Sequence, residues 1–212
     1  MSNTFVDQPL ASFLEALASG TATPGGGSVA ALTGAQAAGL VAMVCNLTIG
    51  KKAYAAFEPE ARALLAQAEA LRHQLQAFIQ ADTDAFNALM AAYRLPKTTD
   101  DEIAARKAAV QAATIKATEV PLAMAAAARA VLPLCAPLAQ HGNRSAVSDV
   151  GAAALAVRAA VPTALLNVDI NLAAIEDAEF AAQARTQATA LLANLDEEVA
   201  AVVAIVQSRI TD

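Results

Sequence analysis

Apolar residues recur along most of this chain three or four residues apart, which is the period of an α-helix. The first such group is Leu10, Phe13, Leu14 and Leu17. A longer apolar stripe extends from Leu64 to Ile79. A sustained alternation of apolar and polar residues, the pattern of a half-buried strand, does not occur in the sequence. The pattern therefore predicts an all-α protein.

Turn and capping residues divide this pattern into segments. Thr99 and Glu102 have the spacing of a capping box, and Ser28 is expected to be the N-cap of the second helix. With no repeat or linker in the sequence, we expect residues 1–212 to form one domain, a bundle of about eight helices. The expected helices span about 10–17, 28–50, 59–95, 99 onward with a kink or restart at Pro121, 145 onward with an interruption at Pro162, and 178–210, with a loop-rich stretch around 133–143.

Hydrophobic residues make up 57% of the chain and charged residues only 16%. So few charges favour long helices that pack on one another and on a partner chain, so a soluble homodimer is expected. The segment Ser28–Gly50 carries no charge and is long enough to span a bilayer. It contains several polar residues, however, and no basic or aromatic belt brackets both its ends. We therefore expect a helix buried on all sides by protein, and no membrane association.

The net charge of −6 and the low aromatic content of 4%, with no tryptophan, argue against nucleic acid as a partner. Cys45 and Cys135 lie far apart and form no CxxC motif, which is typical of buried free thiols in a reducing compartment. His73 and His141 are too few for a typical zinc site, so no metal is expected. The N-terminus has no signal-peptide pattern. These features predict a cytoplasmic protein.

The sharpest local motif is Pro24-Gly25-Gly26-Gly27-Ser28, which opens a helix. Glycines let a ligand approach the backbone closely, and we expect Gly26 to have a positive φ. The N–H groups at the helix N-terminus suit an anion. The alternative is an ordinary turn between helices, although such a turn rarely needs three glycines.

Polar residues mark four further candidate positions. Asn46 and Thr48 stand on an apolar helix, and Lys51 and Lys52 follow just past its C-terminus. Either these polar residues line a site, or the two lysines simply stabilise the helix C-terminus. Asp82 lies close to a core stripe, where a part-buried carboxylate is tunable as a base or as a counter-ion; the alternative is a solvated acid. Asn143, Ser148 and Asp149 form a third group, which either caps a helix or lines a site. Asn167 and Asn171 form the fourth, and their amides either bind a heterocycle or fix contacts between helices.

Taken in order, these pieces resemble a known family. They read FLEALAS, PGGGSVAAL, MVCNLTIGKK, DTDAF, AAYRLPK, ATEVPL, GNRSAVSDVG and LLNVDINL. The ordered set resembles the family that contains the cyclodeaminase domain of formimidoyltransferase-cyclodeaminase and the stand-alone methenyltetrahydrofolate cyclohydrolases. The resemblance covers essentially the whole chain and implies an all-helical dimer with a folate ligand. The absence of a formimidoyltransferase domain in the chain favours the cyclohydrolase.

The resemblance implies roles for the candidate residues. Asp82, or as second choice Asp149, would hold the cationic amidinium of methenyltetrahydrofolate and take a proton from water. Lys51 would relay a proton to N5, and Lys52 would contact the glutamate tail. The glycine segment would accept the pterin edge or a tail carboxylate. Neither a metal nor a redox cofactor is expected. Two alternatives stay open: a formimidoyltetrahydrofolate cyclodeaminase and a non-catalytic helical protein that oligomerises.

Overall fold

The computed structural model describes residues 4–211, and within them every regular element is a helix, as expected. Six α-helices have 15 or more residues, and α1 and α5 are short, so the expected number of about eight is reached only with these two included. Three short 3-10 helices complete the chain. The elements are η1 Phe5–Asp7, α1 Leu10–Leu17, α2 Gly26–Thr48, η2 Lys52–Tyr54, α3 Glu58–Tyr93, α4 Asp100–Arg129, α5 Leu132–His141, η3 Arg144–Ala146, α6 Val147–Leu172, α7 Ala178–Leu192 and α8 Leu195–Thr211.

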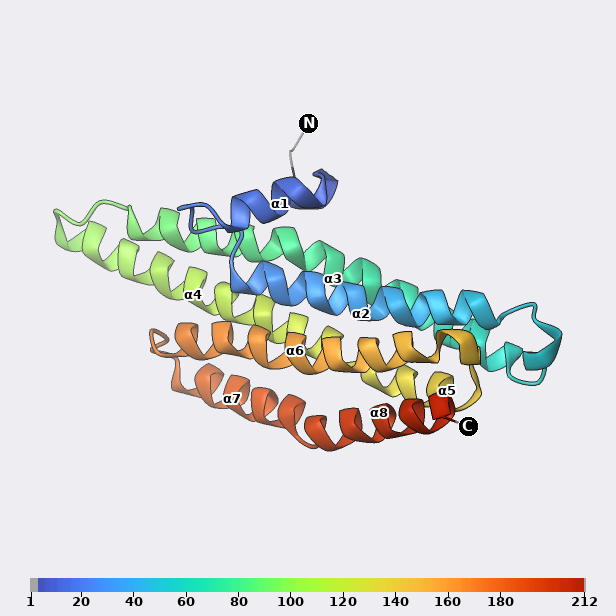
Figure 1. The fold of residues 1–212 in the computed structure, drawn as a ribbon. Coiled ribbons are helices and arrows are strands. Elements are labelled where there is room, and N and C mark those ends of the chain that lie inside the picture. The colour runs from blue at the N-terminus through green and yellow to red at the C-terminus, as the bar shows by residue number, and fades with distance from the viewer. Residues whose placement is uncertain (1–3, 212) are drawn as a thin grey trace.

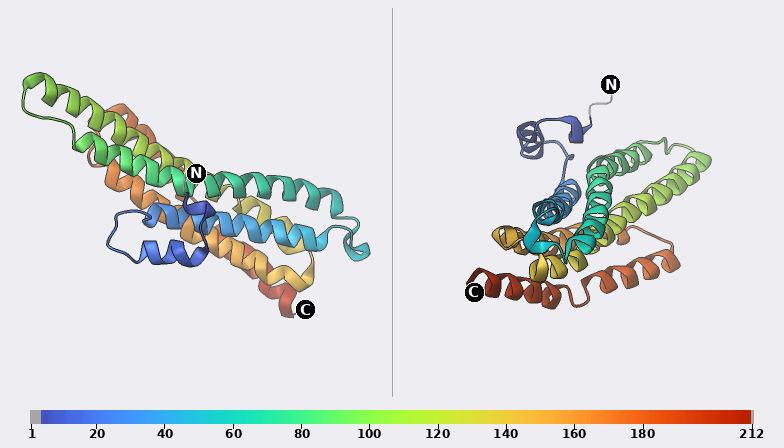
Figure 2. Two further views of the ribbon diagram at one scale, coloured as in Figure 1. Left: turned by 90° about the horizontal axis from the view of Figure 1, so that it is seen from above. Right: turned by 90° about the vertical axis from the view of Figure 1, so that its right-hand side faces the viewer.

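The helices α2, α3, α4 and α6 form an elongated four-helix bundle (Figure 1). In it α2 packs on α3 and α6, and α4 packs on the same two helices. Helix α7 packs on α4 and α6, α8 packs on α6, and α5 packs on α6 and α8, whereas α1 lies outside the bundle near α2 and α3 (Figure 2). One side of α2 and α6 is left without a covering helix.

Small side chains fill most of the core of the bundle. The buried faces of α2 and α6 consist largely of alanine and valine, such as Ala37, Ala38, Ala153 and Val157. At Gly34 a Cβ atom would lie 3.0 Å from a side-chain methyl of Leu75, so the helix backbones approach closely there. The high alanine content is therefore explained by close helix packing.

Several helix boundaries confirm the sequence pattern. Thr99 and Glu102 form the predicted capping box, with each side chain bonded to the backbone of the other residue. Pro59 lies in the first turn of α3, where its missing N–H costs no helical hydrogen bond. Both cysteines are buried and unpaired, as expected, and burial raises the pKa of Cys45 to about 11.

The predictions of a helix restart at Pro121, an interruption at Pro162 and a loop-rich stretch around 133–143 are wrong. The helices α4 and α6 continue through Pro121 and Pro162, so neither proline ends a helix. Pro121 is buried, and packing of its neighbours compensates for the single hydrogen bond lost. The stretch expected to be rich in loops is instead α5, because Pro133 occupies the first turn, where proline is tolerated.

Two other boundaries also differ from the prediction. The last helix is divided into α7 and α8 at Ala193 and Asn194, and Asn194 has a φ of 55°, a left-handed conformation that asparagine tolerates. Ser28 is not an N-cap: α2 begins at Gly26, Gly25 is its N-cap, and the Ser28 side chain points to another helix.

Three helical segments are long and apolar enough to cross a membrane by length and composition alone, namely Gly26–Thr48, Asp100–His141 and Arg144–Leu172. The bundle buries 50 to 61% of their apolar windows. The expectation that the second helix is buried on all sides is wrong for a single chain, because Met43 and Leu47 of α2 are exposed. In a single chain, α2 and α6 therefore expose apolar side chains to solvent.

Candidate active site

The candidate residues gather at the two ends of α2. We call the first group the carboxylate end, which comprises Pro24, Gly25, Gly26, Gly27, Ser28, Asp82, Asn167 and Asn171. We call the second group the lysine end, which comprises Asn46, Thr48, Lys51, Lys52, Asn143, Ser148 and Asp149. Helices α2 and α6 run antiparallel, because Asn167 lies near Gly26 and Asn143 bonds to Thr48.

At the carboxylate end, Asp82 of α3 faces the first turn of α2. The Ser28 hydroxyl donates a 2.9 Å hydrogen bond to Asp82 Oδ2. Asp82 is half-buried, and this burial raises the pKa of its carboxyl, while the hydrogen bonds from the Ser28 side chain and backbone lower it by a smaller amount. A carboxylate in this position accepts a proton more readily than a solvated one, as a general base requires.

The backbone of the glycine segment differs from the expected conformation. Gly26 does not have a positive φ; among the described glycines only Gly50 does, at 74°. Gly26 begins α2, and its nearest neighbour for an added Cβ is Asn167 Nδ2 at 4.0 Å. At Gly27, by contrast, a Cβ would lie only 2.1 Å from Asp82 Oδ1. The glycine is therefore required at 27, where it lets the Asp82 carboxylate reach the N-terminus of α2.

A pocket of about 440 Å³ opens beside Asp82, between α3, α4 and α6. Asn167 and Asn171 line it, and each donates its Nδ2 group to a backbone carbonyl, that of Thr163 at 3.1 Å and that of Ala117 at 2.8 Å. Their Oδ1 atoms form no hydrogen bond with residues 4–211, so both are free to accept one from a ligand. A heterocycle with several N–H groups fits this arrangement.

The apolar walls of this pocket were not predicted from the sequence. Phe86, Met90 and Tyr93 follow Asp82 along α3 and line the pocket with Ile170 of α6. Their spacing from Asp82, at four, eight and eleven residues, places them on the same helical face. That periodicity was the available signal, and it identifies a flat apolar wall next to a carboxylate.

The lysine end is held together by hydrogen bonds between segments. The backbone N–H of Asn143 donates to the Thr48 hydroxyl at 2.9 Å, and Asn143 Nδ2 donates to the carbonyl of Leu47 at 2.8 Å. The backbone N–H of Arg144 donates to the Tyr54 hydroxyl at 3.1 Å. Thr48 and Asn143 thus tie α2 to the start of α6, a structural role that competes with the predicted binding role.

Positive charge accumulates at this end. Lys51, Lys52 and Arg144 are exposed, and within residues 4–211 none of them forms an ion pair. Asp149, the second candidate base, lies half-buried in the first turn of α6. In a protein of net charge −6, three unneutralised cations in one place suit an anionic ligand.

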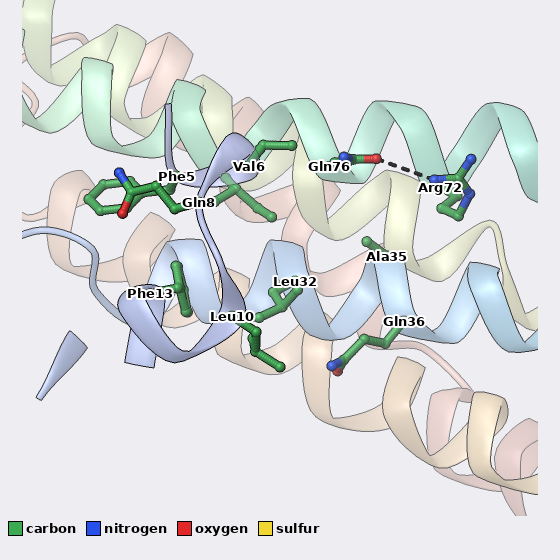
Figure 3. Close-up of a pocket in the computed structure, with 11 residues that line it drawn as sticks. Phe5, Val6, Gln8, Leu10, Phe13, Leu32, Ala35, Gln36, Arg72 and Gln76 are labelled. Carbon is green, nitrogen blue, oxygen red and sulfur yellow. Dashed lines mark hydrogen bonds between the residues drawn. The ribbon is translucent and has the colours of Figure 1, made fainter. Parts of the chain in front are cut away.

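A second pocket, of about 270 Å³, lies between the N-terminal segment, α2 and α3 (Figure 3). Phe5, Phe13 and Leu32 provide apolar walls, and Arg72 at its edge is bonded to Glu69 and Gln76. None of the candidate residues from the sequence lines this pocket. The chemistry of the candidate site therefore lies at the two ends of α2.

Gly27→Ala is expected to lower turnover at least tenfold and to destabilise the protein by about 1–3 kcal/mol, because the added methyl overlaps Asp82 and displaces it. The matched control is Gly20→Ala, where an added methyl meets nothing within 4 Å and both properties should stay near wild type. Initial rates and melting curves of the two variants measure this difference. Equal activity of both variants would show that the contact between Asp82 and α2 is dispensable.

Comparison with known proteins gives a consistent result. Residues 9–190 match the family described as Formiminotransferase-cyclodeaminase. The chain is 44% identical over 187 residues to a Methylorubrum extorquens protein named methenyltetrahydrofolate cyclohydrolase, which covers 88% of this chain and 90% of that protein.

Two further similarities extend this comparison. The chain is 34% identical over 206 residues to the Sus scrofa formimidoyltransferase-cyclodeaminase, and this match spans 97% of the chain but 38% of that protein. The crystal structure of a Thermotoga maritima formiminotetrahydrofolate cyclodeaminase superposes with a TM-score of 0.85 at 28% identity, covering 96% of this chain and 98% of that one.

Proposed function

Because the chain belongs to the formiminotransferase-cyclodeaminase family, we infer that it is a methenyltetrahydrofolate cyclohydrolase. The observation that carries this conclusion is the 44% identity to a relative of that name, which aligns along 90% of the relative's own length. The formimidoyltransferase-cyclodeaminase from Sus scrofa, by contrast, is 34% identical and aligns along 38% of its length.

The reaction is hydrolysis of a cyclic amidinium. Water adds to the bridge carbon between N5 and N10 and loses a proton, which gives a neutral tetrahedral intermediate. As the bond from carbon to N5 then breaks, N5 takes up a proton and the hydroxyl of the intermediate releases its own, which gives the formyl carbonyl of 10-formyltetrahydrofolate. One group must therefore accept a proton from water, and another must deliver one to N5.

Asp82 is our candidate for the first role. Its carboxylate stabilises the cationic substrate and, with its raised pKa, accepts the proton of the attacking water. The pocket beside it receives the pterin ring, whose N–H groups donate to Asn167 and Asn171 and whose face packs on Phe86. Asp149 remains the second candidate for the base.

Lys51 is our candidate for the proton donor, and Lys52 contacts the carboxylates of the glutamate tail. Both are unpaired within the described chain and free to meet an anion. In this proposal the reaction proceeds by side-chain acid–base chemistry, without a metal or redox cofactor. The protein acts in the cytoplasm, without nucleic acid or membrane as partner.

The direct test is to add purified protein to methenyltetrahydrofolate and follow the absorbance of its cation. A cyclohydrolase makes this absorbance decay faster than in buffer. The likeness to a solved cyclodeaminase structure favours the alternative activity, in which formimidoyltetrahydrofolate loses ammonia and the same absorbance rises. Assaying both substrates therefore separates the two, and the non-catalytic alternative predicts no effect on either.

We further propose that the protein is a homodimer formed through the exposed side of α2 and α6. Light scattering should give twice the chain mass of 21.5 kDa. Leu155→Asp places a charge on α6 at a side chain that is 48% exposed, so it should yield monomers without unfolding the chain. Ile103→Asp is the matched control, since Ile103 is 51% exposed on α4. Wild-type monomers at micromolar concentration would contradict the proposal.

A further inference from the structure

The two groups of candidate residues lie too far apart in one chain to act on one substrate carbon. Ser28, which bonds Asp82, and Thr48, which adjoins the lysine end, are separated by 20 residues of continuous helix, or about 30 Å. A general base and a proton donor for one reaction must each come within hydrogen-bond reach of the reacting atoms. Within a single chain, the site is incomplete at both ends.

The surface between the two ends is uncharged and apolar. No residue of α2 is charged, and Met43 and Leu47 are exposed on its outer side. On α6, Leu155, Leu166 and Ile170 are exposed, with Ile170 at 72%. The interior charges of α6 point elsewhere: Arg158 bonds Asp196 of α8, and Asp169 lines a pocket with Arg185 of α7. Figure 1 shows α2 and α6 side by side along this face.

We propose that a second copy of the chain covers this face and that each active site is shared, with Asp82 and the pterin pocket from one protomer and Lys51 and Lys52 from the other. This proposal rests on the proposed function. A two-fold axis through the middle of the face, near the exposed Gln36 of α2, places the first turn of one α2 against the last turn of the partner's. The two ends then meet twice, once on each side of the axis.

The charges of the two ends complement the two ends of the substrate. The amidinium cation of methenyltetrahydrofolate lies at Asp82, and the tail carboxylates extend toward Lys52 and Arg144, cations that have no ion-pair partner within residues 4–211. Ile170 belongs both to the pocket wall and to the apolar face, so the pocket opens where the second copy docks. A partner at this face therefore closes the pocket and completes the set of charges.

Mixed dimers test the shared site. Asp82→Asn and Lys51→Ala chains carrying different tags are co-expressed, and heterodimers are isolated by tandem purification. In a shared site, each heterodimer contains one site with both native residues and one with neither, so about half of wild-type turnover is expected from two inactive variants. Sites contained within one chain would leave both sites defective and the heterodimer inactive, which would overturn the proposal.

The matched control reverses the outcome. A wild-type chain is paired with an Asp82→Asn/Lys51→Ala chain, so that both mutations lie on one protomer. A shared site then loses one residue in each of the two sites, and turnover should fall at least 50-fold below wild type. A site within one chain would retain half the activity and contradict the proposal.

Other results would also decide the question. Full activity of Lys51→Ala, failure to form dimers, or flotation of the monomer with lipid vesicles would each overturn the shared site.

If wild-type protein does not hydrolyse methenyltetrahydrofolate, the proposed function fails separately. The same heterodimers are then titrated with 5-formyltetrahydrofolate. A shared site predicts that the heterodimer of the two single variants has half as many tight binding sites as wild type, and that neither homodimer of a single variant has any. Equal binding by all of them overturns it.

Discussion

Asp82→Asn should lower turnover by about 100-fold or more while the chain stays folded. The amide keeps the size of the side chain and an oxygen that accepts the hydrogen bond from Ser28, now 2.9 Å long. It cannot accept a proton from water or neutralise the substrate cation. The loss should therefore appear in kcat, measured as the decay of methenyltetrahydrofolate absorbance. Asp84→Asn is the matched control, since Asp84 is exposed and bonded to Gln80.

The same substitution should leave the protein at least as stable as wild type at pH 7. Burial raises the pKa of Asp82 in the folded state above its unfolded value, so the folded protein binds this proton more tightly. Wild type therefore loses stability as the pH rises through these two values, and the asparagine variant does not. Melting temperatures measured from neutral pH down to about pH 3 should converge as Asp82 protonates.

Two results would argue against this role for Asp82. Near-normal turnover in Asp82→Asn would make Asp149 the candidate base. A melting temperature well below wild type at pH 7 would mean that the Asp82 carboxylate holds α2 and α3 together, and the activity loss would then reflect structure. Loss of turnover with an undiminished melting temperature distinguishes a catalytic carboxylate from a structural one.

Lys51→Ala should also lower kcat by about 100-fold, because the proton for N5 loses its donor. Lys51→Arg should not restore the rate, since a guanidinium keeps its charge but does not release its proton. Lys52→Ala should instead raise KM with little change in kcat, as expected for a group that binds the tail in the ground and transition states alike. Steady-state kinetics on the three variants measures both constants.

A distant lysine provides the control for these variants. Lys107 is exposed, is paired with Glu176 at 2.9 Å and does not line the pocket beside Asp82, so Lys107→Ala should leave kcat and KM unchanged. If Lys51→Ala behaves like Lys107→Ala, the lysine end has no part in proton transfer.

The sequence predicted the helices better than their ends. Helical periodicity depends on which side chains are buried, so it identified α1 and α3 closely. The predicted restart at Pro121 and interruption at Pro162 do not occur, because packing on both sides of a long helix outweighs one lost hydrogen bond. Where the bundle surrounds a helix, burial of the side chains outweighs the local helix-breaking effect of a proline.

The sequence identified candidate site residues, but it did not predict which of them lie together in the fold. Asp82 and the glycine segment are far apart in sequence, and only the packing of α3 on α2 shows that Gly27 is the glycine in contact with the carboxylate. The distance between Asp82 and Lys51 could not be predicted either, because the sequence does not show which end of α2 the Asp82 side chain packs against. The pocket wall at Phe86 was readable from periodicity and was overlooked.

The unbroken length of α2 has an evolutionary consequence. Each residue of a helix advances the chain by about 1.5 Å and turns it by about 100°. Inserting or deleting one residue between Ser28 and Thr48 would therefore rotate Lys51 away from its place relative to Asp82. The connection between α3 and α4, at 94–99, carries no such constraint, because it lies at one tip of the bundle. Natural variation in chain length should accumulate at that tip, while α2 keeps a constant number of residues.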